Sequence, residues 1–532
     1  MCKLCDAGRP QNHSRTQLGR RDFLKASAAS AAGATAMSLF SAPARATDDD
    51  EGLPPDTGRP GRRYVIRGGH VMSMDPNVRD FVRADVLVEG KKIIAVGPNV
   101  PAGGAGVIDA RGKIVMPGFV DTHHHQFETA TRSVLADALL FDGLDPAITY
   151  NYFQKELLGF APVYRPEDVY ISELFGGLAQ LDNGVTTVHD VSQIHHSPAH
   201  SDAAIQALFD TGRRAAFGYF ESAGGVAGNQ YPTDAFRIKA RWFSSDDQLV
   251  TMIMGGEIYL PGYEAAWRIG RQLGIPVAAH IVGTFGMRGE FDAIADGLRD
   301  VGQQPGQSGF GPDNLFIHMT GMSDNAWTKM QAAGSGVSFA VPIEMNMRHG
   351  TPPVLKAMEL NFQPSLSTDV EVTLTADFFT QMRAAMALQR MFMNARALFH
   401  SGVPNGVNEA YAADFPELPL LTVRDVLRWA TINGARDLRL EGKTGSLTPG
   451  KEADIILLEP GINAAPLNHV PGAVVSLMER GNVESVIVAG KVRKWKGKLR
   501  DVNLGKLRRD LENSRDYLFE AAGIPQNLFR AP

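Results

Sequence analysis

Five residues of metal-binding or acid–base type fall at or near the ends of apolar runs that are typical of β-strands. His123 and His125 follow the run IVMPGFVDT, and His280, His318 and Asp369 end three later runs. Side chains alternate along a strand, so His123 and His125 share one face, whereas the residue between them points the other way. Neutral imidazoles together with a carboxylate suit zinc, iron or a similar divalent ion. The spacing therefore indicates metal chemistry.

The elements that must position these residues are eight strand-like runs, which alternate with helix-like segments. The runs are IVMPGFVDT, VTTVHD, RAAFGYF, LVTMIMGG, PVAAH, LFIHM, GVSFAVP and PSLSTD. Eightfold strand–helix alternation is typical of an α/β fold of the (β/α)8 TIM-barrel type, whose catalytic groups lie at the C-terminal ends of the strands. We therefore expect a catalytic barrel domain over residues 118–445, with the five residues at one rim.

Two other β-rich segments lie on either side of this region. Residues 64–117 and 446–500 carry β-branched runs broken by Gly and Asn turns, and we expect them to pair into one small β-sandwich domain. Residues 501–532 read as a charged, helical C-terminal tail. The Met- and Phe-rich segment 378–399 has helical spacing, which favours core or oligomer packing over a substrate channel.

The first 46 residues have the features of an export signal. The run RRDFLK (residues 20–25) resembles a twin-arginine motif, a weakly apolar Ala- and Ser-rich stretch follows it, and Ala44-Arg45-Ala46 fits a cleavage site. We expect the twin-arginine export machinery to deliver the protein to the periplasm or the extracellular space. Residues 47–63 read as a linker. The only cysteines, Cys2 and Cys5, lie in the segment that cleavage would remove.

Composition places the chain among ordinary globular proteins. Of its 532 residues, 44% are hydrophobic and 21% are charged, which excludes a disordered chain. Cleavage after Ala46 would remove seven basic and two acidic residues and change the net charge from −5 to −10. A nucleic-acid partner is therefore not expected, and neither is anchoring of the mature form to a membrane. The expected partner is a small-molecule substrate.

Several segments together resemble the amidohydrolase superfamily, in its triazine chlorohydrolase and cytosine deaminase branch. PGFVDTHHH resembles the first-strand signature, NGVTTVHD the second-strand segment, AAHIVG and FIHMTGMSD the fifth- and sixth-strand positions, and LSTD the eighth-strand aspartate. ATINGARDLRLEGKTGSLTPGKEADIILLE resembles the C-terminal signature. The match runs from about Tyr64 to Gly497. It implies a distorted TIM barrel with a flanking β-sandwich, and the dimers common among relatives make a homo-oligomer an open expectation.

The resemblance also implies a role for each residue. His123, His125, His280 and Asp369 are the expected ligands of one divalent ion, zinc first and iron second. Such an ion lowers the pKa of a bound water to about 7. Asp369 would carry the proton of the attacking water to the leaving group, and His318 would stabilise the charge on the attacked centre. The predicted fourth strand does not end in a lysine, so a binuclear centre on a carboxylated lysine is not expected.

One position departs from the family pattern. Deaminases of this branch commonly carry a glutamate three residues after the fifth-strand histidine, where it passes a proton to the ring nitrogen. This sequence has Gly283 there. Cytosine-type deamination is therefore in doubt. Glu257, beyond the fourth strand, and Glu371, two residues after Asp369, are alternative acids; each is also consistent with a hydrogen-bonded loop carboxylate.

Other residues near the expected rim are candidates for the substrate pocket. They are Glu257, His189, Glu344 and His349, and each is also consistent with a structural role. We expect His124 to be a buried, hydrogen-bonded core residue. His195, His196 and His200 follow the second strand, and the pattern favours an exposed loop for them.

These observations favour a hydrolase that cleaves a C–N bond in an amide, an amidine or an aminoheterocycle, with deamination as a sub-case. Displacement of another leaving group from a heteroaromatic ring, such as chloride, uses the same chemistry and is the first alternative. A catalytically inactive metal-binding homologue is the second, although an intact set of buried ligands argues against it.

Overall fold

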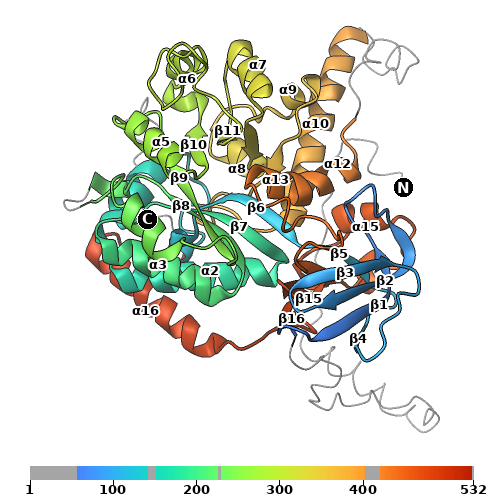
Figure 1. Ribbon diagram of the computed structural model, residues 1–532. Coiled ribbons are helices and arrows are strands. Elements are labelled where there is room, and N and C mark those ends of the chain that lie inside the picture. Colours follow the sequence, from blue (N-terminus) through green and yellow to red (C-terminus); the bar gives the residue numbers. More distant parts are fainter. Residues whose placement is uncertain (1–56, 142–150, 226–228, 402–419, 530–532) are drawn as a thin grey trace, which may run out of the picture. The chain divides into compact units, whose positions relative to one another are not determined.

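Eight parallel strands form the central sheet, in the order β13-β12-β11-β10-β9-β8-β7-β6 (Figure 1). The computed structural model describes residues 57–141, 151–225, 229–401 and 420–529. The export signal expected over residues 1–46 lies outside them. The barrel strands are β6 (Phe119–His124), β7 (Val185–Ser192), β8 (Arg214–Tyr219), β9 (Val250–Gly255), β10 (Val277–Ile281), β11 (Asn314–His318), β12 (Gly336–Phe339) and β13 (Ser365–Leu366).

The last strand returns to the first, so the barrel is nearly closed. A parallel bridge joins His124 to Asp369, just beyond β13. The Asp369 N–H donates to the His123 carbonyl over 3.0 Å, and the His125 N–H donates to the Asp369 carbonyl over 2.9 Å. The eight strands expected from the sequence are all present, which confirms the barrel.

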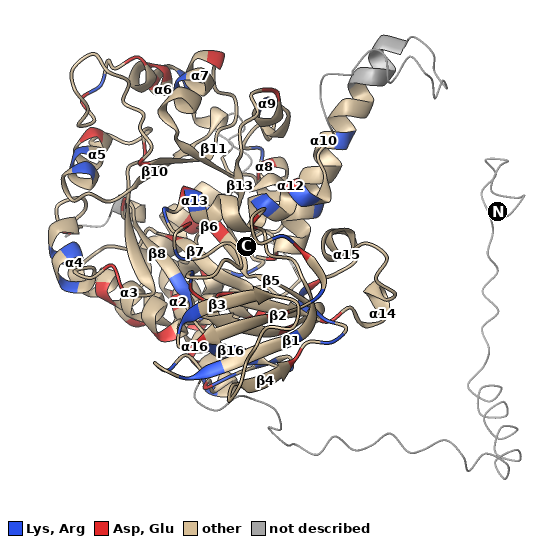
Figure 2. Ribbon diagram, turned by 45° about the vertical axis from the view of Figure 1, so that its right-hand side comes forward, with Lys and Arg blue, Asp and Glu red and all other residues tan. Residues whose placement is uncertain are grey.

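Helices follow the strands and cover the outside of the barrel. Figure 2 shows charged residues on outer helices such as α4 and α5, whereas the barrel strands carry few. In α7, the Ser323 hydroxyl accepts the Ala326 N–H at the first turn, and Gly334 ends the helix in the left-handed conformation. The helices of the barrel region are α2 (Pro166–Asp182), α3 (Pro198–Thr211), α4 (Ala235–Trp242), α5 (Tyr263–Gln272), α6 (Arg288–Ala295), α7 (Asp324–Ala333), α8 (Val341–Asn346), α9 (Val354–Glu359), α10 (Phe378–Ser401), α12 (Val423–Arg428) and α13 (Gly434–Asp437).

Shorter helical turns complete this region, and further helices lie near the C-terminus. The turns are η2 (Gln126–Thr131), η3 (Phe153–Phe160), η4 (Ala161–Val163), η5 (Ala223–Gly225), η6 (Gly283–Phe285) and η7 (Trp429–Asn433). The C-terminal elements are α14 (Gly461–Ala464), α15 (Val470–Ser476), η8 (Arg480–Asn482) and α16 (Leu504–Ala522). The helical tail expected after residue 500 is thus present as α16.

A second sheet joins both ends of the described chain. Its path is β17-β16-β15-β14-β5-β1-β2-β3, and β4 pairs with β1. The N-terminal strands are β1 (Arg63–Val71), β2 (Phe81–Glu89), β3 (Lys92–Gly97), β4 (Gly106–Asp109) and β5 (Ile114–Pro117); the C-terminal strands are β14 (Ile455–Leu458), β15 (Val483–Val488), β16 (Lys491–Trp495) and β17 (Lys498–Leu499). The two segments meet where β5 pairs antiparallel with β14, so the expected pairing of the chain ends is confirmed.

The expected first barrel strand is divided between the two sheets. Its first residues form β5 and its last residues form β6, and Gly118 lies between them. A Cβ atom at Gly118 would lie 2.1 Å from the Thr186 side chain, so only glycine fits at this crossing. The crossing brings β6, which carries the paired histidines, directly from the flanking sheet into the barrel.

A buried ion-pair cluster joins the barrel to the segment before β14. Arg214, at the start of β8, contacts Asp454 and Glu452, each over 2.7 Å, and its side chain is 1% exposed. The Met- and Phe-rich segment forms α10, where Phe378, Phe379 and Met382 are buried, as expected for core packing. Within the described residues, no helix combines the length and the apolar character needed to cross a membrane.

Candidate metal centre and active site

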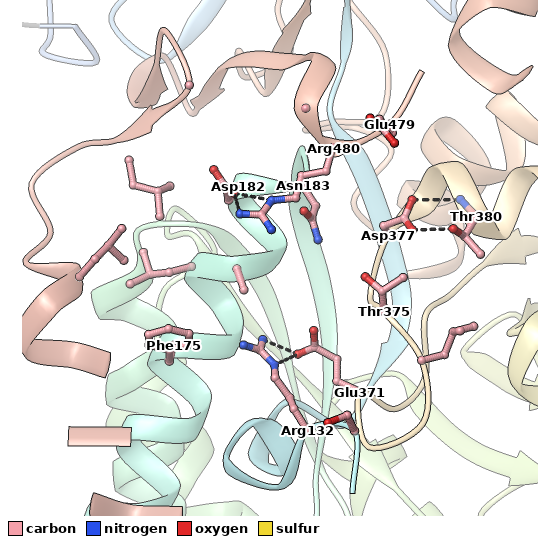
Figure 3. Close-up of a pocket in the computed structure, with 18 of the residues that line it drawn as sticks. Arg132, Phe175, Asp182, Asn183, Glu371, Thr375, Asp377, Thr380, Glu479 and Arg480 are labelled. Atoms are coloured by element: carbon pink, nitrogen blue, oxygen red, sulfur yellow. Dashed lines mark hydrogen bonds and ion pairs between the residues drawn. The ribbon is translucent and has the colours of Figure 1, made fainter. Parts of the chain in front are cut away.

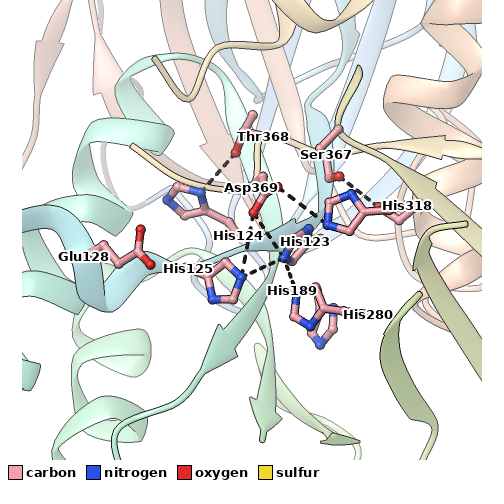
Figure 4. Close-up of polar contacts among 12 residues, drawn as sticks. His123, His124, His125, Glu128, His189, His280, His318, Ser367, Thr368 and Asp369 are labelled. Carbon is pink, nitrogen blue, oxygen red and sulfur yellow. Dashed lines mark hydrogen bonds and ion pairs between the residues drawn. The ribbon is translucent and has the colours of Figure 1, made fainter. Parts of the chain in front are cut away.

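Four side chains from three separate parts of the barrel meet at the C-terminal ends of its strands (Figure 4). The Nε2 atom of His123 lies 3.0 Å from Nε2 of His125 and 2.9 Å from Nε2 of His280. Asp369 Oδ1 lies 3.5 Å from His123 Nε2 and 3.7 Å from His125 Nε2. The four residues named from the sequence as metal ligands are therefore in mutual contact.

His318 and His349 extend the cluster on one side. His318 Nε2 lies 3.6 Å from Asp369 Oδ2. Possible ligand atoms of His318, His349 and Asp369 lie within 4.8 Å of one another, as do those of His123, His280 and His318. The structure thus brings together all five residues that end strands in the sequence, and adds His349.

The electrostatics of this cluster favour a cation at its centre. Burial, with repulsion from neighbouring rings, lowers the pKa of His123 and His125 well below the usual value, so both rings are neutral. Two Nε2 atoms approach His123 Nε2, but a neutral ring has only one N–H to offer, so lone pairs face each other. Asp369 Oδ2 is buried without a hydrogen-bond partner. The donor set therefore fits a divalent ion.

Burial also governs the protonation of Asp369. It raises the pKa of this carboxyl to about 7, while attraction to His280 acts in the opposite direction. The residue has a φ of +62°, and His318 has a φ of +70°. Such left-handed backbone in residues other than glycine is sparse and concentrates at functional sites.

Two buried glutamates lie behind the cluster. Glu257 Oε1 lies 2.5 Å from His280 Nδ1, and Glu344 Oε1 lies 3.1 Å from His318 Nδ1. Burial alone would lower the pKa of His280, but Glu257 outweighs it and raises that pKa. Neither glutamate lines the cavity at the site. Both carboxyls lie against imidazole rings of the cluster, in the position from which a carboxylate can orient a histidine.

A small apolar cavity of about 40 Å³ adjoins the cluster. Ligand pockets commonly measure about 300 Å³ or more, so this cavity is much smaller than a usual ligand pocket. In its lining, Tyr259 and Phe285 stack at a centroid distance of 5.0 Å. The lining residues are His125, Leu140, Tyr152, Phe153, Leu157, Gln193, Tyr259, His280, Val282, Phe285, His318, Met347, His349, Asp369 and Val370.

The remaining candidate residues differ in where they lie. His349 lines this cavity, as the sequence suggested, whereas His189 does not. His189 is fully buried, and its Nδ1 lies 2.9 Å from the Thr122 carbonyl oxygen. His124 points away from the cluster and contacts the Thr368 hydroxyl over 3.1 Å, as expected for a core residue.

The expectation that three further histidines lie in an exposed loop is wrong. His195, His196 and His200 are all buried. His195 contacts Ser201 and the Ser192 carbonyl, each over 2.9 Å. Their polar character suggested solvent, but local hydroxyls and carbonyls satisfy the rings inside the protein.

Glu371 belongs to a different cavity. Its carboxylate forms an ion pair with Arg132, and both line a charged hollow of about 1420 Å³ (Figure 3). That hollow also contains Arg383, Asp182 and Arg480. Since the Glu371 carboxylate is held by Arg132 outside the small cavity, Glu371 is not placed to act as the acid.

The glycine that departs from the family pattern is required by packing. A Cβ atom at Gly283 would lie 2.9 Å from the Thr320 carbonyl oxygen. A glutamate at this position would displace the backbone that follows β11. The absence of the expected acid is thus built into the fold.

Asp121 and Thr368 were not singled out in the sequence, yet they hold the site together. Asp121 Oδ1 accepts the N–H groups of His123 over 3.2 Å and of Thr368 over 3.1 Å. Asp121 lies two residues before the first expected ligand, and this spacing is the sequence feature that could have identified it.

The comparisons with known proteins agree with this architecture. The model of the amidohydrolase family matches residues 114–493. A 5'-deoxyadenosine deaminase of Methanosarcina mazei is 27% identical over 80% of this chain and 92% of its own length. A 5-methylthioadenosine/S-adenosylhomocysteine deaminase of Symbiobacterium thermophilum is 26% identical over 81% and 93%.

Solved structures share the fold. An adenosine deaminase from Xanthomonas campestris with bound zinc superposes with a TM-score of 0.68 at 21% identity, over 87% of this chain and 99% of that one. An atrazine chlorohydrolase of Arthrobacter aurescens complexed with zinc gives 0.66 at 19% identity, over 85% and 100%. The family model covers most of the sequence, and the barrel carries the expected metal ligands at the C-terminal ends of its strands. This chain therefore belongs to the amidohydrolase family.

Proposed function

We propose that this protein is a metal-dependent deaminase that replaces the amino group of an aminoheterocycle, with adenosine-type nucleosides as its substrate class. The convergence of His123, His125, His280 and Asp369 around one point carries the proposal. Two curated relatives that match most of the chain are named as deaminases of 5'-deoxyadenosine and of 5-methylthioadenosine. They favour ammonia over chloride as the leaving group.

We assign one divalent ion, zinc before iron, to these four residues. When bound, the ion supplies Lewis acidity and makes a water molecule acidic enough to attack near neutral pH. Glu257 fixes the tautomer of His280. It accepts the Nδ1–H of that ring, so the Nε2 lone pair is directed at the proposed metal position. The native metal and a homo-oligomeric state are further parts of the proposal.

Asp369 is the proton carrier in this scheme. Its Oδ2 atom is buried without a hydrogen-bond partner, so it can accept a proton from the attacking water and release it to the departing amine. Its contact with His123 keeps it beside the reacting atoms.

His318 has the opposite task, which is to donate. Burial raises the pKa of Glu344 well above the usual value, so its carboxyl is protonated and can donate to His318 Nδ1. The ring proton then lies on Nε2, the atom that faces Asp369. From there it can stabilise negative charge that develops on the attacked centre.

The test is ammonia release by the zinc-loaded protein. We would incubate it with adenosine, 5'-deoxyadenosine, 5-methylthioadenosine and a set of aminotriazines and aminopyrimidines, with Asp369→Asn as the blank. Ammonia from at least one nucleoside supports the proposal. Chloride released from a chlorotriazine, with no ammonia from any amine, would transfer the assignment to dechlorination, and turnover of neither class by metal-loaded protein would contradict both.

We also propose export to the periplasm or the extracellular space by the twin-arginine route. The support is the run Arg20-Arg21-Asp22-Phe23-Leu24-Lys25, followed by a weakly apolar stretch and a small-residue cleavage site.

A further inference from the structure

The active-site cavity lacks the family's usual acid, so a proton donor must come from elsewhere. Gly283 has no room for a side chain, Glu257 is engaged with His280, and Glu371 is paired with Arg132. Water that adds to an amidine carbon needs a proton delivered to the ring nitrogen, because the electron pair of the C=N bond moves there. A replacement donor must line the cavity and must itself be hydrogen-bonded to an acid that can restore its proton.

Tyr152 meets this description. It lines the cavity together with His125, His280 and Asp369, and it stands immediately before η3. Its hydroxyl donates a hydrogen bond to Glu128 Oε1. Both side chains are buried, so water does not compete for this contact.

Glu128 belongs to a pair of carboxyls that has no countercharge. Glu128 and Glu156 are both fully buried, and each has one oxygen without a partner. The Thr131 hydroxyl lies 2.9 Å from the Glu128 carbonyl oxygen and 3.2 Å from Glu156 Oε1. Among the residues that the structure describes, neither carboxyl takes part in an ion pair. Two buried carboxylates without a cation are unfavourable, so the pair must hold at least one proton.

The local electrostatics agree with this geometry. Burial raises the pKa of Glu156 to about 8. Burial, with repulsion from Glu156, raises the pKa of Glu128 well above the usual value. A carboxylic acid is thus available near neutral pH one hydrogen bond away from a phenol in the cavity.

We propose that Tyr152 delivers the proton to the ring nitrogen of the substrate, while Glu128 positions it and replaces its proton, with Glu156 as the second carboxyl of the buried pair. The proposal rests on the deamination proposed above. Tyr152 is the catalytic residue because it lines the cavity, and the two glutamates are positioning residues.

The proton balance closes over one turnover. Water forms the new C–O bond and gives one proton to Asp369, while the ring nitrogen takes the phenol proton and Tyr152 takes the proton of Glu128. The C–N bond to the amino group then breaks, and the amine leaves as ammonia with the proton from Asp369. The new C–OH group loses its proton as C=O forms, and that proton restores the pair.

The test compares Tyr152→Phe with Tyr164→Phe in the zinc-loaded full chain. Tyr164 is also buried, but its hydroxyl donates to the Phe127 carbonyl, and it does not line the cavity. We expect Tyr152→Phe to lower kcat by about 10²–10⁴-fold with a smaller change in KM, and Tyr164→Phe to retain kcat. The loss should be smaller for a substrate with a more basic ring nitrogen. Zinc content and thermal unfolding of each variant show whether it is folded.

The glutamates are tested through the pH profile and an infrared spectrum. Wild-type activity should fall as Glu128 ionises at alkaline pH, and Glu128→Gln should lower kcat and abolish this limb. Glu156→Gln should move the limb to lower pH, since it removes the repulsion that keeps Glu128 protonated. The protonated-carboxyl infrared band should shrink in Glu128→Gln.

The outcomes separate this inference from the proposed function. Ammonia release by wild-type protein with full kcat in Tyr152→Phe would overturn the role of Tyr152 and leave deamination intact. An alkaline limb unchanged in both glutamine variants would overturn the role of the pair. Failure of wild-type protein to release ammonia from any amine would instead count against the function itself.

Discussion

Asp369 is joined to His123 twice, once through its backbone and once through its side chain. The backbone N–H of Asp369 donates to the His123 carbonyl over 3.0 Å, and Oδ1 of the same residue lies 3.5 Å from His123 Nε2. The contact that closes the barrel is thus also the contact that assembles the site, so backbone and side-chain roles can be separated by substitution.

The first prediction concerns Asp369→Asn. Asparagine tolerates the left-handed backbone that Asp369 adopts, with a φ of +62°, and keeps the backbone bonds. We expect folding to persist, and kcat/KM to fall by about 10²-fold or more, because an amide cannot carry the proton. Circular dichroism and ammonia release measure the two effects. An active variant would remove Asp369 from the proposed mechanism.

The second prediction separates two glutamates that lie behind histidines. Glu257→Gln weakens the hydrogen bond to His280 and should lower zinc affinity by about 10–100-fold. Glu344→Gln alters the bond to His318, so we expect it to lower kcat more than zinc affinity. Competition with a chromogenic chelator measures affinity for both variants. Equal losses of affinity would show that His318 is a ligand on the same footing as His280.

The third prediction is the pH dependence of metal binding. In the metal-free protein, burial raises the pKa of Asp369 to about 7, so below this pH a proton occupies a ligand that zinc needs. Apparent zinc affinity should therefore rise with pH and level off above about 7. Binding should also release protons, which calorimetry in buffers of different ionisation enthalpy detects. An apparent zinc affinity that does not change as the pH rises toward 7 would contradict the expected competition.

The fourth prediction concerns the ion cluster between the barrel and the C-terminal segment. Arg214→Ala leaves Asp454 buried without its ion-pair partner, whereas Glu452 keeps its contacts with Lys91 and Lys92, and we expect a loss of about 3–5 kcal/mol in the free energy of unfolding. Arg299→Ala removes the more exposed pair with Glu290 and should lower the free energy of unfolding much less. Denaturant titration compares the two; equal losses would count against the burial argument.

The ion pairs of Arg214 also determine how the stability of the protein changes at acidic pH. Burial alone would raise the pKa of Glu452, but Arg214, together with Lys91 and Lys92, outweighs it and lowers that pKa below its usual 4.5. A lowered folded-state pKa stabilises the protein above 4.5, and this contribution is lost as pH falls through the folded value. Arg214→Ala should therefore flatten the acid limb of stability, which denaturant titrations at several pH values would show.

The fifth prediction addresses export. Changing Arg20 and Arg21 to lysine should retain the precursor inside the cell, whereas changing Lys3 should not. Fractionation followed by immunoblotting measures the distribution. Normal export of the double variant would argue against the twin-arginine route.

The sequence was most informative where function depends on local spacing. His123 and His125 share a strand face by alternation, and His280, His318 and Asp369 each end an apolar run, so their meeting at one rim followed from the barrel rule. Glu257 and Glu344 were placed near the rim, but side-chain direction is set by packing. The sequence therefore did not predict that both glutamate side chains point toward histidines and not into the cavity.

Other differences arise from contacts between distant segments. The run from residue 114 to 122 reads as one strand, yet it is divided at Gly118 between two sheets. Thr186 leaves no room for a side chain at this crossing, and that contact comes from a distant segment. His196 was expected to be exposed, but the Ala161 carbonyl accepts from it over 2.8 Å inside the protein. Such partners become visible only when the chain is folded.

The pairing of β5 with β14 has a consequence for biosynthesis. Pro117 in β5 pairs with Ile455 in β14. One edge of β5 therefore has no partner strand until the ribosome has made nearly the whole polypeptide. The second sheet can therefore be completed only late in synthesis, and until then this edge of β5 offers unpaired backbone groups to other strands.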